Sequence, residues 1–225
     1  MSVTTEDYLK RIFIASEGTD RTLIGLGEVA SALGVTPGTV TTMMKSLSDA
    51  WLVDYRPRSG VVLTDAGRRE ALDVLRRHRL IELFLVEVLK LDWAEVHEEA
   101  EVLEHAVSDR LLRRIDELLG HPTTDPHGDP IPDSDGLIVH SEGPTLAEVA
   151  APATVRLVRV EHDDSGFLVF LKGAGLIPGA AVEVVERDAD AGTVTVATAG
   201  QRRSLSFQVA ERLRVEVVSA GRSRG

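Results

Sequence analysis

Carboxylate and imidazole side chains are concentrated in residues 95–109, which read EVHEEAEVLEHAVSD. Residues three and four apart lie on the same face of a helix. The side chains with this spacing are His97, Glu101, Glu104 and His105. Oxygen and nitrogen ligands on one face suit a divalent cation, so the spacing indicates a metal site. A solvated acidic surface is the alternative interpretation.

Further upstream, His78 and Glu82 are four residues apart in another segment with helical periodicity. They form a second pair of potential ligands on one helix face. Histidines clustered in both segments favour metal binding over a purely solvated surface.

Catalysis is a competing interpretation of the same residues. The run from His97 to Glu101 is partly similar to the zinc-protease pattern H-E-x-x-H, but Glu101 replaces the second histidine. The sequence contains neither G-x-S-x-G nor a phosphate-binding glycine loop. It also has no cysteine, which excludes disulfides, thiolate metal sites and cysteine nucleophiles. We therefore expect a protein that is not an enzyme.

The composition sets the context for these residues. The 225 residues exceed what one small core organises, so two or three domains are expected. The net charge of -11 is unevenly distributed, because residues 95–105 are acidic whereas GRREALDVLRRHR is basic. No signal-peptide pattern is present, and no stretch approaches the ~20 apolar residues of a membrane helix. We expect a soluble cytoplasmic protein without a membrane partner.

The N-terminal part of the sequence predicts a DNA-reading fold. Helical periodicity over residues 5–17 is followed by a short amphipathic helix that ends at Gly34. Thr36 is suited to cap the next helix, and Pro37 to begin it. Two β-prone runs, residues 52–55 and 61–64, flank the turn RPRSG. This order predicts a winged helix-turn-helix.

Polar residues on the second helix and on the wing are the candidates for DNA contact. On the helix they are Thr36, Thr39, Thr41, Thr42 and Lys45. Arg56 and Arg58 lie in the wing, and their guanidinium groups suit phosphates. Threonine methyl groups can contact the thymine methyl, and hydroxyls can bind phosphate oxygens. A protein-interaction module with a solvated polar helix is the alternative.

The remainder divides into a helical part and a β-rich part. Long helices are predicted over residues 65–91 and 93–119, with apolar faces for partner helices. The Pro- and Asp-rich run GHPTTDPHGDPIPDSDG then predicts a linker. Five β-prone runs follow, VRLVRVEHD, GFLVFLKGAG, AAVEVVERD, GTVTVATAG and RRSLSFQV, and indicate a small barrel. The fold class is therefore α+β.

Several motifs in order resemble the diphtheria toxin repressor family of iron- and manganese-dependent repressors. They are TTEDYLKRIF, RRHRLIE, EVHEEAEVLEHAVSD and GDPIP, followed by the β-rich tail. The resemblance covers nearly the whole chain. It implies a DNA-binding domain over 1–73, a helical dimerisation and metal-binding domain over 74–120, a linker over 121–151 and an SH3-like, FeoA-like domain over 152–219. It also implies a homodimer on double-stranded operator DNA.

The resemblance further implies two metal sites in each chain. The ligands of the primary site would be Asp7, Glu101, Glu104 and His105. The ligands of the ancillary site would be His78, Glu82, His97 and a carboxylate of the C-terminal domain. Asp164 matches that carboxylate best, and Asp163 and Glu161 are alternatives.

Departures from the family pattern bear on the choice of metal. The iron branch has methionine in place of Asp7 and cysteine in place of Glu101. Carboxylates favour Mn²⁺ over softer metals, so we expect a manganese-activated repressor of metal-homeostasis genes. Activation by Fe²⁺ and a winged-helix sensor of a non-metal ligand are the alternatives. Short manganese regulators have glutamate in place of Lys10, which indicates separate sites here. Lys10 is expected either to be solvated or to pair with Asp7.

Overall fold

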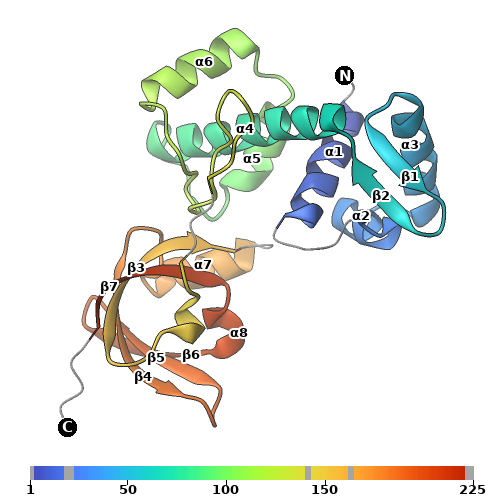
Figure 1. The fold of residues 1–225 in the computed structure, drawn as a ribbon. Helices are drawn as coiled ribbons and strands as arrows, with labels where there is room; N and C mark the ends of the chain where they lie inside the picture. The colour runs from blue at the N-terminus through green and yellow to red at the C-terminus, as the bar shows by residue number, and fades with distance from the viewer. Residues whose placement is uncertain (1–2, 18–22, 140–142, 162–164, 221–225) are drawn as a thin grey trace. The chain divides into compact units, whose positions relative to one another are not determined.

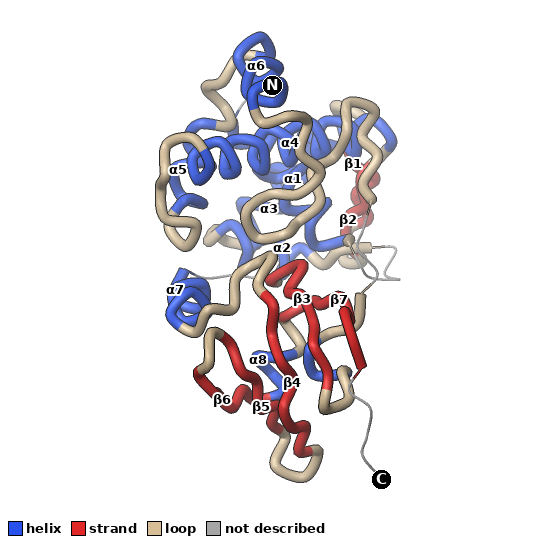
Figure 2. The backbone as a smooth tube through the Cα atoms, turned by 90° about the vertical axis from the view of Figure 1, so that its left-hand side faces the viewer, coloured by secondary structure: helices blue, strands red, loops and turns tan. Residues whose placement is uncertain are grey.

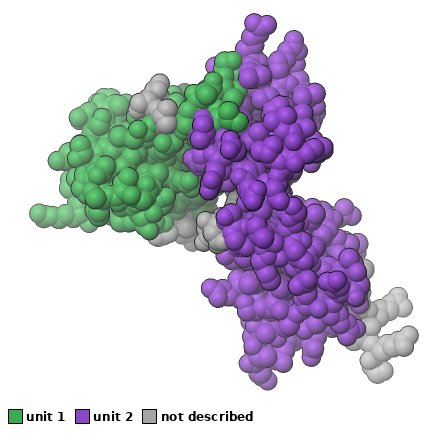
Figure 3. All heavy atoms as spheres, turned by 180° about the vertical axis from the view of Figure 1, so that it is seen from behind, with its two compact units in different colours: residues 1–78, 103–108, 132–137 green, residues 79–102, 109–131, 138–225 purple. Residues whose placement is uncertain are grey.

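The computed structural model describes residues 3–17, 23–139, 143–161 and 165–220. Two compact units are distinguished in Figure 3. The first comprises residues 1–78, 103–108 and 132–137, and the second comprises residues 79–102, 109–131 and 138–225.

The first unit contains the predicted winged helix-turn-helix. Its helices are α1 (Val3–Ser16), α2 (Leu26–Leu33), α3 (Pro37–Asp49) and the first part of α4 (Asp65–Glu87), and its strands are β1 (Val53–Arg56) and β2 (Gly60–Leu63). Figure 1 shows the hairpin β1–β2 beside α3. The side chain of Thr36 accepts a hydrogen bond from the N–H of Thr39, so the predicted cap of α3 is present.

The passage from the wing into α4 depends on a close backbone approach. A Cβ added at Gly67 would lie 1.9 Å from the carbonyl oxygen of Leu52, so only glycine fits there. The hydroxyl of Thr64 accepts a hydrogen bond from the N–H of Gly67 at 3.1 Å. These contacts fix the direction in which α4 leaves the wing.

The prediction of one helix over residues 93–119 is wrong. The structure has two helices, α5 (Val96–Leu103) and α6 (Asp109–Leu118), with a turn over residues 104–108. Glu104 and His105 therefore lie beyond the end of α5. Asp109 stands in the first turn of α6, where an acidic residue favours a helix start. Helix α4 ends at Glu87, earlier than the predicted Leu91.

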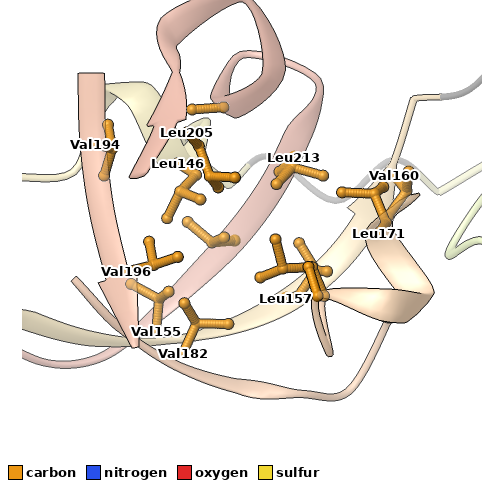
Figure 4. Close-up of a cluster of buried hydrophobic side chains, with 14 of the residues drawn as sticks. Leu146, Val155, Leu157, Val160, Leu171, Val182, Val194, Val196, Leu205 and Leu213 are labelled. Atoms are coloured by element: carbon orange, nitrogen blue, oxygen red, sulfur yellow. The ribbon is translucent and has the colours of Figure 1, made fainter. Parts of the chain in front are cut away.

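The β-rich part of the second unit is a five-stranded antiparallel sheet that curves around a hydrophobic core (Figure 2). Its strands are β3 (Ala153–Val160), β4 (Ala181–Asp188), β5 (Thr193–Thr198), β6 (Gln201–Ser206) and β7 (Leu213–Ala220), in the order β6-β5-β4-β3-β7. The turn η1 (Leu146–Glu148) and the helix α8 (Phe207–Ala210) complete it. Buried branched side chains fill its interior, including Val155, Leu157, Val182, Val196 and Leu213 (Figure 4). The α+β fold class is confirmed.

One prediction for this part is wrong, and one strand was missed. The run GFLVFLKGAG forms helix α7 (Ser165–Gly173) and not a strand. Leu168 and Leu171 are buried three residues apart, which is helical spacing, but a short apolar run does not distinguish helix from strand. The strand β7 was not predicted.

Part of the predicted linker is buried: residues 125–131, which belong to the second unit, are buried except for the half-buried Pro126. The carboxylate of Asp125 accepts hydrogen bonds from the N–H groups of His127 and Asp129. Gly128 has φ +85°, and a Cβ there would lie 2.0 Å from the carbonyl oxygen of Val158. The segment is thus held against β3. Among the described residues, no helix combines the length and apolarity needed to cross a membrane.

Candidate functional site

The outward face of α3 carries the residues predicted to contact DNA. Thr36, Thr39, Thr42 and Lys45 are exposed, and Thr41 is half-buried. Thr41 and Thr42 donate their hydroxyl hydrogens to the carbonyls of Pro37 and Gly38. Each hydroxyl oxygen keeps lone pairs that can still accept a hydrogen bond.

The wing adds exposed cationic groups to the same unit. Arg56 Nη2 lies 2.8 Å from Asp54 Oδ2, and the two side chains are 59% and 51% exposed. An ion pair with this exposure contributes little, so the guanidinium of Arg56 is available to a phosphate at small cost. Arg58 is exposed at the tip of the wing, with φ 67°.

A carboxylate–imidazole cluster within the first unit contains three of the predicted primary ligands. Asp7, Glu104 and His105 place one ligand atom each within 4.8 Å of the others. His105 Nε2 lies 2.9 Å from Asp7 Oδ1 and 3.3 Å from Glu104 Oε1. Two carboxylates and one imidazole fit a hard divalent ion such as Mn²⁺ or Fe²⁺.

Glu6 is a functional candidate that the sequence did not single out. Its Oε2 accepts a hydrogen bond from His105 Nδ1 at 2.7 Å. A carboxylate in this position fixes the ring orientation and leaves Nε2 as the ligand atom. Glu6 directly precedes Asp7, and the position alone gave no reason to distinguish the two carboxylates.

Glu104 is the most deeply buried member of the cluster. Lys10 Nζ lies 2.6 Å from Glu104 Oε1, and His78 Nδ1 lies 2.6 Å from Glu104 Oε2. The Lys10 side chain is 2% exposed and that of Glu104 is 0% exposed. The expectation of a solvated Lys10 is therefore wrong, because its ammonium is buried and paired with Glu104.

The other predicted ligands are distributed over both units. His78 belongs to the first unit, whereas Glu82, His97 and Glu101 belong to the second. Within the second unit, His97 Nδ1 lies 3.0 Å from Glu82 Oε1, and His97 Nε2 lies 3.4 Å from Glu101 Oε1. Asp164 and Asp163 lie outside the described residues.

Glu161, the third candidate for the C-terminal carboxylate, is described. Its Oε1 lies 3.3 Å from Arg214 Nε. The two side chains are 37% and 42% exposed, so this ion pair is a weak one and leaves the carboxylate accessible.

A second cluster, within the second unit, includes two residues of the predicted linker. Glu82, Asp125 and His127 are all buried, and their ligand atoms lie within 4.8 Å of one another. His127 Nε2 lies 2.8 Å from the carbonyl oxygen of Trp93, so Nε2 carries the hydrogen. When the ring is neutral, Nδ1 then offers a lone pair, and it lies 3.9 Å from Glu82 Oε2.

The electrostatics of this second cluster favour a cation. The pKa of Asp125 is raised well above its ordinary value, first by burial and then by the negative charges of Asp129 and Glu82. Arg79 opposes the shift, with its Nε 3.8 Å from Asp125 Oδ2. The motif GDPIP pointed to this segment, but its lack of periodicity concealed the buried Asp125 and His127.

The fold defines a winged-helix DNA-binding protein. The two clusters add side chains that can coordinate a divalent metal ion. Three family models match successive parts of the chain. They are the iron-dependent repressor N-terminal DNA-binding domain over residues 1–61, the iron-dependent repressor metal-binding and dimerisation domain over residues 64–133, and the FeoA domain over residues 145–217.

Curated relatives agree over almost their full length. The iron-dependent repressor IdeR of Mycobacterium tuberculosis is 33% identical, with 96% of this chain and 97% of IdeR covered. The diphtheria toxin repressor of Corynebacterium diphtheriae is 30% identical, with 95% and 96% covered. The chain therefore belongs to the iron-dependent repressor family and is a metal-dependent, DNA-binding transcriptional repressor. This is a family of DNA-binding repressors and not of enzymes.

Solved structures support the same assignment. A manganese-dependent transcriptional repressor in complex with manganese has a TM-score of 0.85 and 38% identity, with 95% of this chain and 100% of that chain covered. ScaR with bound Zn²⁺ has a TM-score of 0.76 and 37% identity, with 94% and 98% covered.

Proposed function

We propose that this protein is a manganese-activated repressor of metal-homeostasis genes. The observation that carries the proposal is the composition of the first cluster, in which Asp7, Glu104 and His105 provide only oxygen and nitrogen ligands. The chain has no cysteine with which to bind softer metals. The similarity to a structure containing manganese supports this choice.

Activation by Fe²⁺ is the second candidate, because the curated relatives are named as iron-dependent repressors. A mobility-shift assay on operator DNA distinguishes the candidates when chelator, Mn²⁺, Fe²⁺ and Zn²⁺ are compared at controlled free concentrations. We expect Mn²⁺ to restore binding within its cellular range. Equal DNA affinity with and without chelator contradicts metal activation by any ion.

We further propose two metal ions in each chain. The primary ion is held by Asp7, Glu104 and His105, with Glu101 as a fourth ligand. The ancillary ion, as the family resemblance implies, uses His78, Glu82, His97 and Asp164. The cluster of Glu82, Asp125 and His127 is a competing location for the second ion, because it shares Glu82.

The DNA-contacting residues are proposed as the sequence predicted them, with α3 in the major groove and the wing on the backbone. Lys45→Ala should weaken binding to all sequences and reduce the salt slope by about one unit for each phosphate that is no longer neutralised. Thr42→Ala should instead change preference at one half-site position. The exposed Lys90, mutated to alanine, is the matched control.

A homodimer in the cytoplasm, where operator DNA is accessible, completes the proposal. Helices α5 and α6 expose apolar side chains that a dimer would bury, with Val102 70%, Leu111 51% and Leu118 65% exposed. Sedimentation of the unmodified protein should give a dimer, and Leu118→Glu should give a monomer. A monomeric unmodified protein at micromolar concentration contradicts this part.

A further inference from the structure

A buried lysine stands beside the first carboxylate–imidazole cluster. The Lys10 side chain is 2% exposed, and its Nζ lies 2.6 Å from Glu104 Oε1. Lysine is almost never fully buried unless it is paired. Helix α1 thus carries an ammonium group into the interior of the first unit, where its charge is balanced by a carboxylate.

The carboxylate that binds this ammonium is also a proposed metal ligand. Glu104 Oε1 lies 3.3 Å from His105 Nε2, the imidazole nitrogen that faces Asp7. The other oxygen, Oε2, lies 2.6 Å from His78 Nδ1. Both oxygens of Glu104 therefore already have cationic or hydrogen-donating neighbours in the structure.

We propose that Lys10 is an internal cation that competes with the metal ion for Glu104 and thereby sets the metal affinity of the first cluster. The inference rests on the proposed metal-binding role of Asp7, Glu104 and His105. Without metal, the ammonium compensates a buried carboxylate that is costly when unpaired. With metal, the ammonium remains as a like charge a few ångströms away and weakens binding.

This competition predicts opposite effects of one substitution on two measured quantities. Lys10→Met keeps an unbranched side chain, one atom shorter, and removes the charge. The metal-free variant should unfold at a lower temperature, because Glu104 is left without its ammonium partner. Its affinity for Mn²⁺, measured by competition with a fluorescent chelator, should rise by about tenfold or more because a nearby positive charge is gone. Saturating Mn²⁺ should therefore raise its unfolding temperature more than that of the unmodified protein.

Two further variants separate charge from packing. Lys90→Met makes the same change of net charge at an exposed position and should alter neither quantity. Lys10→Arg retains the charge and should keep Mn²⁺ affinity near that of the unmodified protein. If Lys10→Met is less stable but binds Mn²⁺ no more tightly, Lys10 is only a structural partner of Glu104 and the proposal is overturned.

A measurement on the unmodified protein does not depend on whether a variant folds. The ¹⁵N resonance of the Lys10 ammonium should shift or disappear as the diamagnetic ion Zn²⁺ is added to one equivalent. A resonance that stays unchanged while Zn²⁺ binds at Asp7 and His105 overturns the competition. If neither the unmodified protein nor Lys10→Met binds Mn²⁺, the proposed function itself fails, which is a different result. Binding by Lys10→Met alone supports the competition.

Discussion

The cluster of the first unit compensates its buried carboxylate with close contacts, whereas the cluster of the second unit does so less completely. Glu104 has Lys10 and His78 at 2.6 Å each. In the second cluster, Arg79 Nε lies 3.8 Å from Asp125 Oδ2, and Glu82 and Asp129 lie close enough to oppose ionisation. The same ligand chemistry is therefore present in two different electrostatic settings.

This difference predicts how each cluster should respond to a divalent cation. A cation at the first cluster has to compete with a positive charge already in place, so its affinity is moderated. A cation at the second cluster would relieve repulsion among buried carboxylates, so it should stabilise the fold strongly there. The first cluster therefore suits a sensor that binds metal only above a certain free concentration. The second cluster suits an ion that stabilises the fold.

The largest effect is expected from removing a ligand of the first cluster. Asp7→Ala eliminates a carboxylate that lies 2.9 Å from His105 Nε2. It should abolish Mn²⁺-activated DNA binding, with a decrease of about a hundredfold or more, since removing a ligand costs more than the 10–100-fold of an outer-shell change. The measurement is a mobility shift at fixed free Mn²⁺.

Asp73→Ala is the control for this substitution, because it removes an exposed carboxylate from α4 in the same unit. It should leave activation unchanged. Full activation of Asp7→Ala by Mn²⁺ would show that the first cluster is not the sensor, and the comparison between the clusters would lose its basis.

The next largest effect concerns the location of the second ion. His127→Ala and His97→Ala each remove an imidazole near Glu82, and they distinguish the buried cluster from the ancillary site implied by the family. If the buried cluster holds the ion, His127→Ala should lower the binding stoichiometry of Mn²⁺ from two to one, and His97→Ala should not. Equilibrium dialysis gives both numbers. The reverse result assigns the ion to the ancillary site and breaks the comparison.

The sequence predicted the winged helix-turn-helix well because its signals are local. Thr36 caps α3 as expected, and Gly34 adopts φ 63° at the end of α2. Three of the proposed primary ligands were also predicted to meet, but that prediction came from the family resemblance. Helical spacing alone placed Glu104 and His105 on a helix that ends at Leu103.

The features that the sequence did not predict depend on contacts between residues far apart in sequence. Lys10 and Glu104 are 94 positions apart, and nothing in the local pattern of α1 indicates that the lysine is buried. Asp125 and His127 lie in a segment without periodicity, whose burial arises from packing against β3. Turn and composition signals identify such a segment as a loop but carry no information on what covers it.

A smaller effect is expected from Glu6, which acts on the first cluster through His105. Glu6→Gln removes the charge that faces His105 Nδ1 at 2.7 Å but keeps a hydrogen-bond acceptor. Mn²⁺ affinity should fall by about tenfold, the lower end of the range for groups that orient a ligand. Chelator competition measures it. An effect as large as that of Asp7→Ala would make Glu6 a direct ligand and would enlarge the first cluster.

The smallest effect is expected from the repulsion among the carboxylates of the second cluster, measured in the absence of metal. The raised pKa of Asp125 means that the folded protein holds this proton more tightly than the unfolded chain does. The free energy of unfolding should therefore decrease as pH rises from about 4, the ordinary value, through the higher pKa of the folded state. Asp125→Asn removes this contribution, while its amide oxygen can still accept from the N–H groups of His127 and Asp129.

Urea unfolding of the chelated protein at pH 5 and pH 7.5 measures how the free energy of unfolding changes with pH. Relative to the unmodified protein, Asp125→Asn should be more stable at the higher pH, by an amount within the range of about 0.5–3 kcal/mol typical of single substitutions.

Asp92 is a control of opposite sign, because its hydrogen bond from Lys172 lowers its pKa. Asp92→Asn should lose a small stabilisation that is present at pH 7.5 and declines as pH falls through the lowered pKa. If Asp125→Asn is instead less stable at pH 7.5 than at pH 5, relative to the unmodified protein, then Arg79 compensates Asp125 fully. The second cluster would then resemble the first, with an arginine in the role of Lys10.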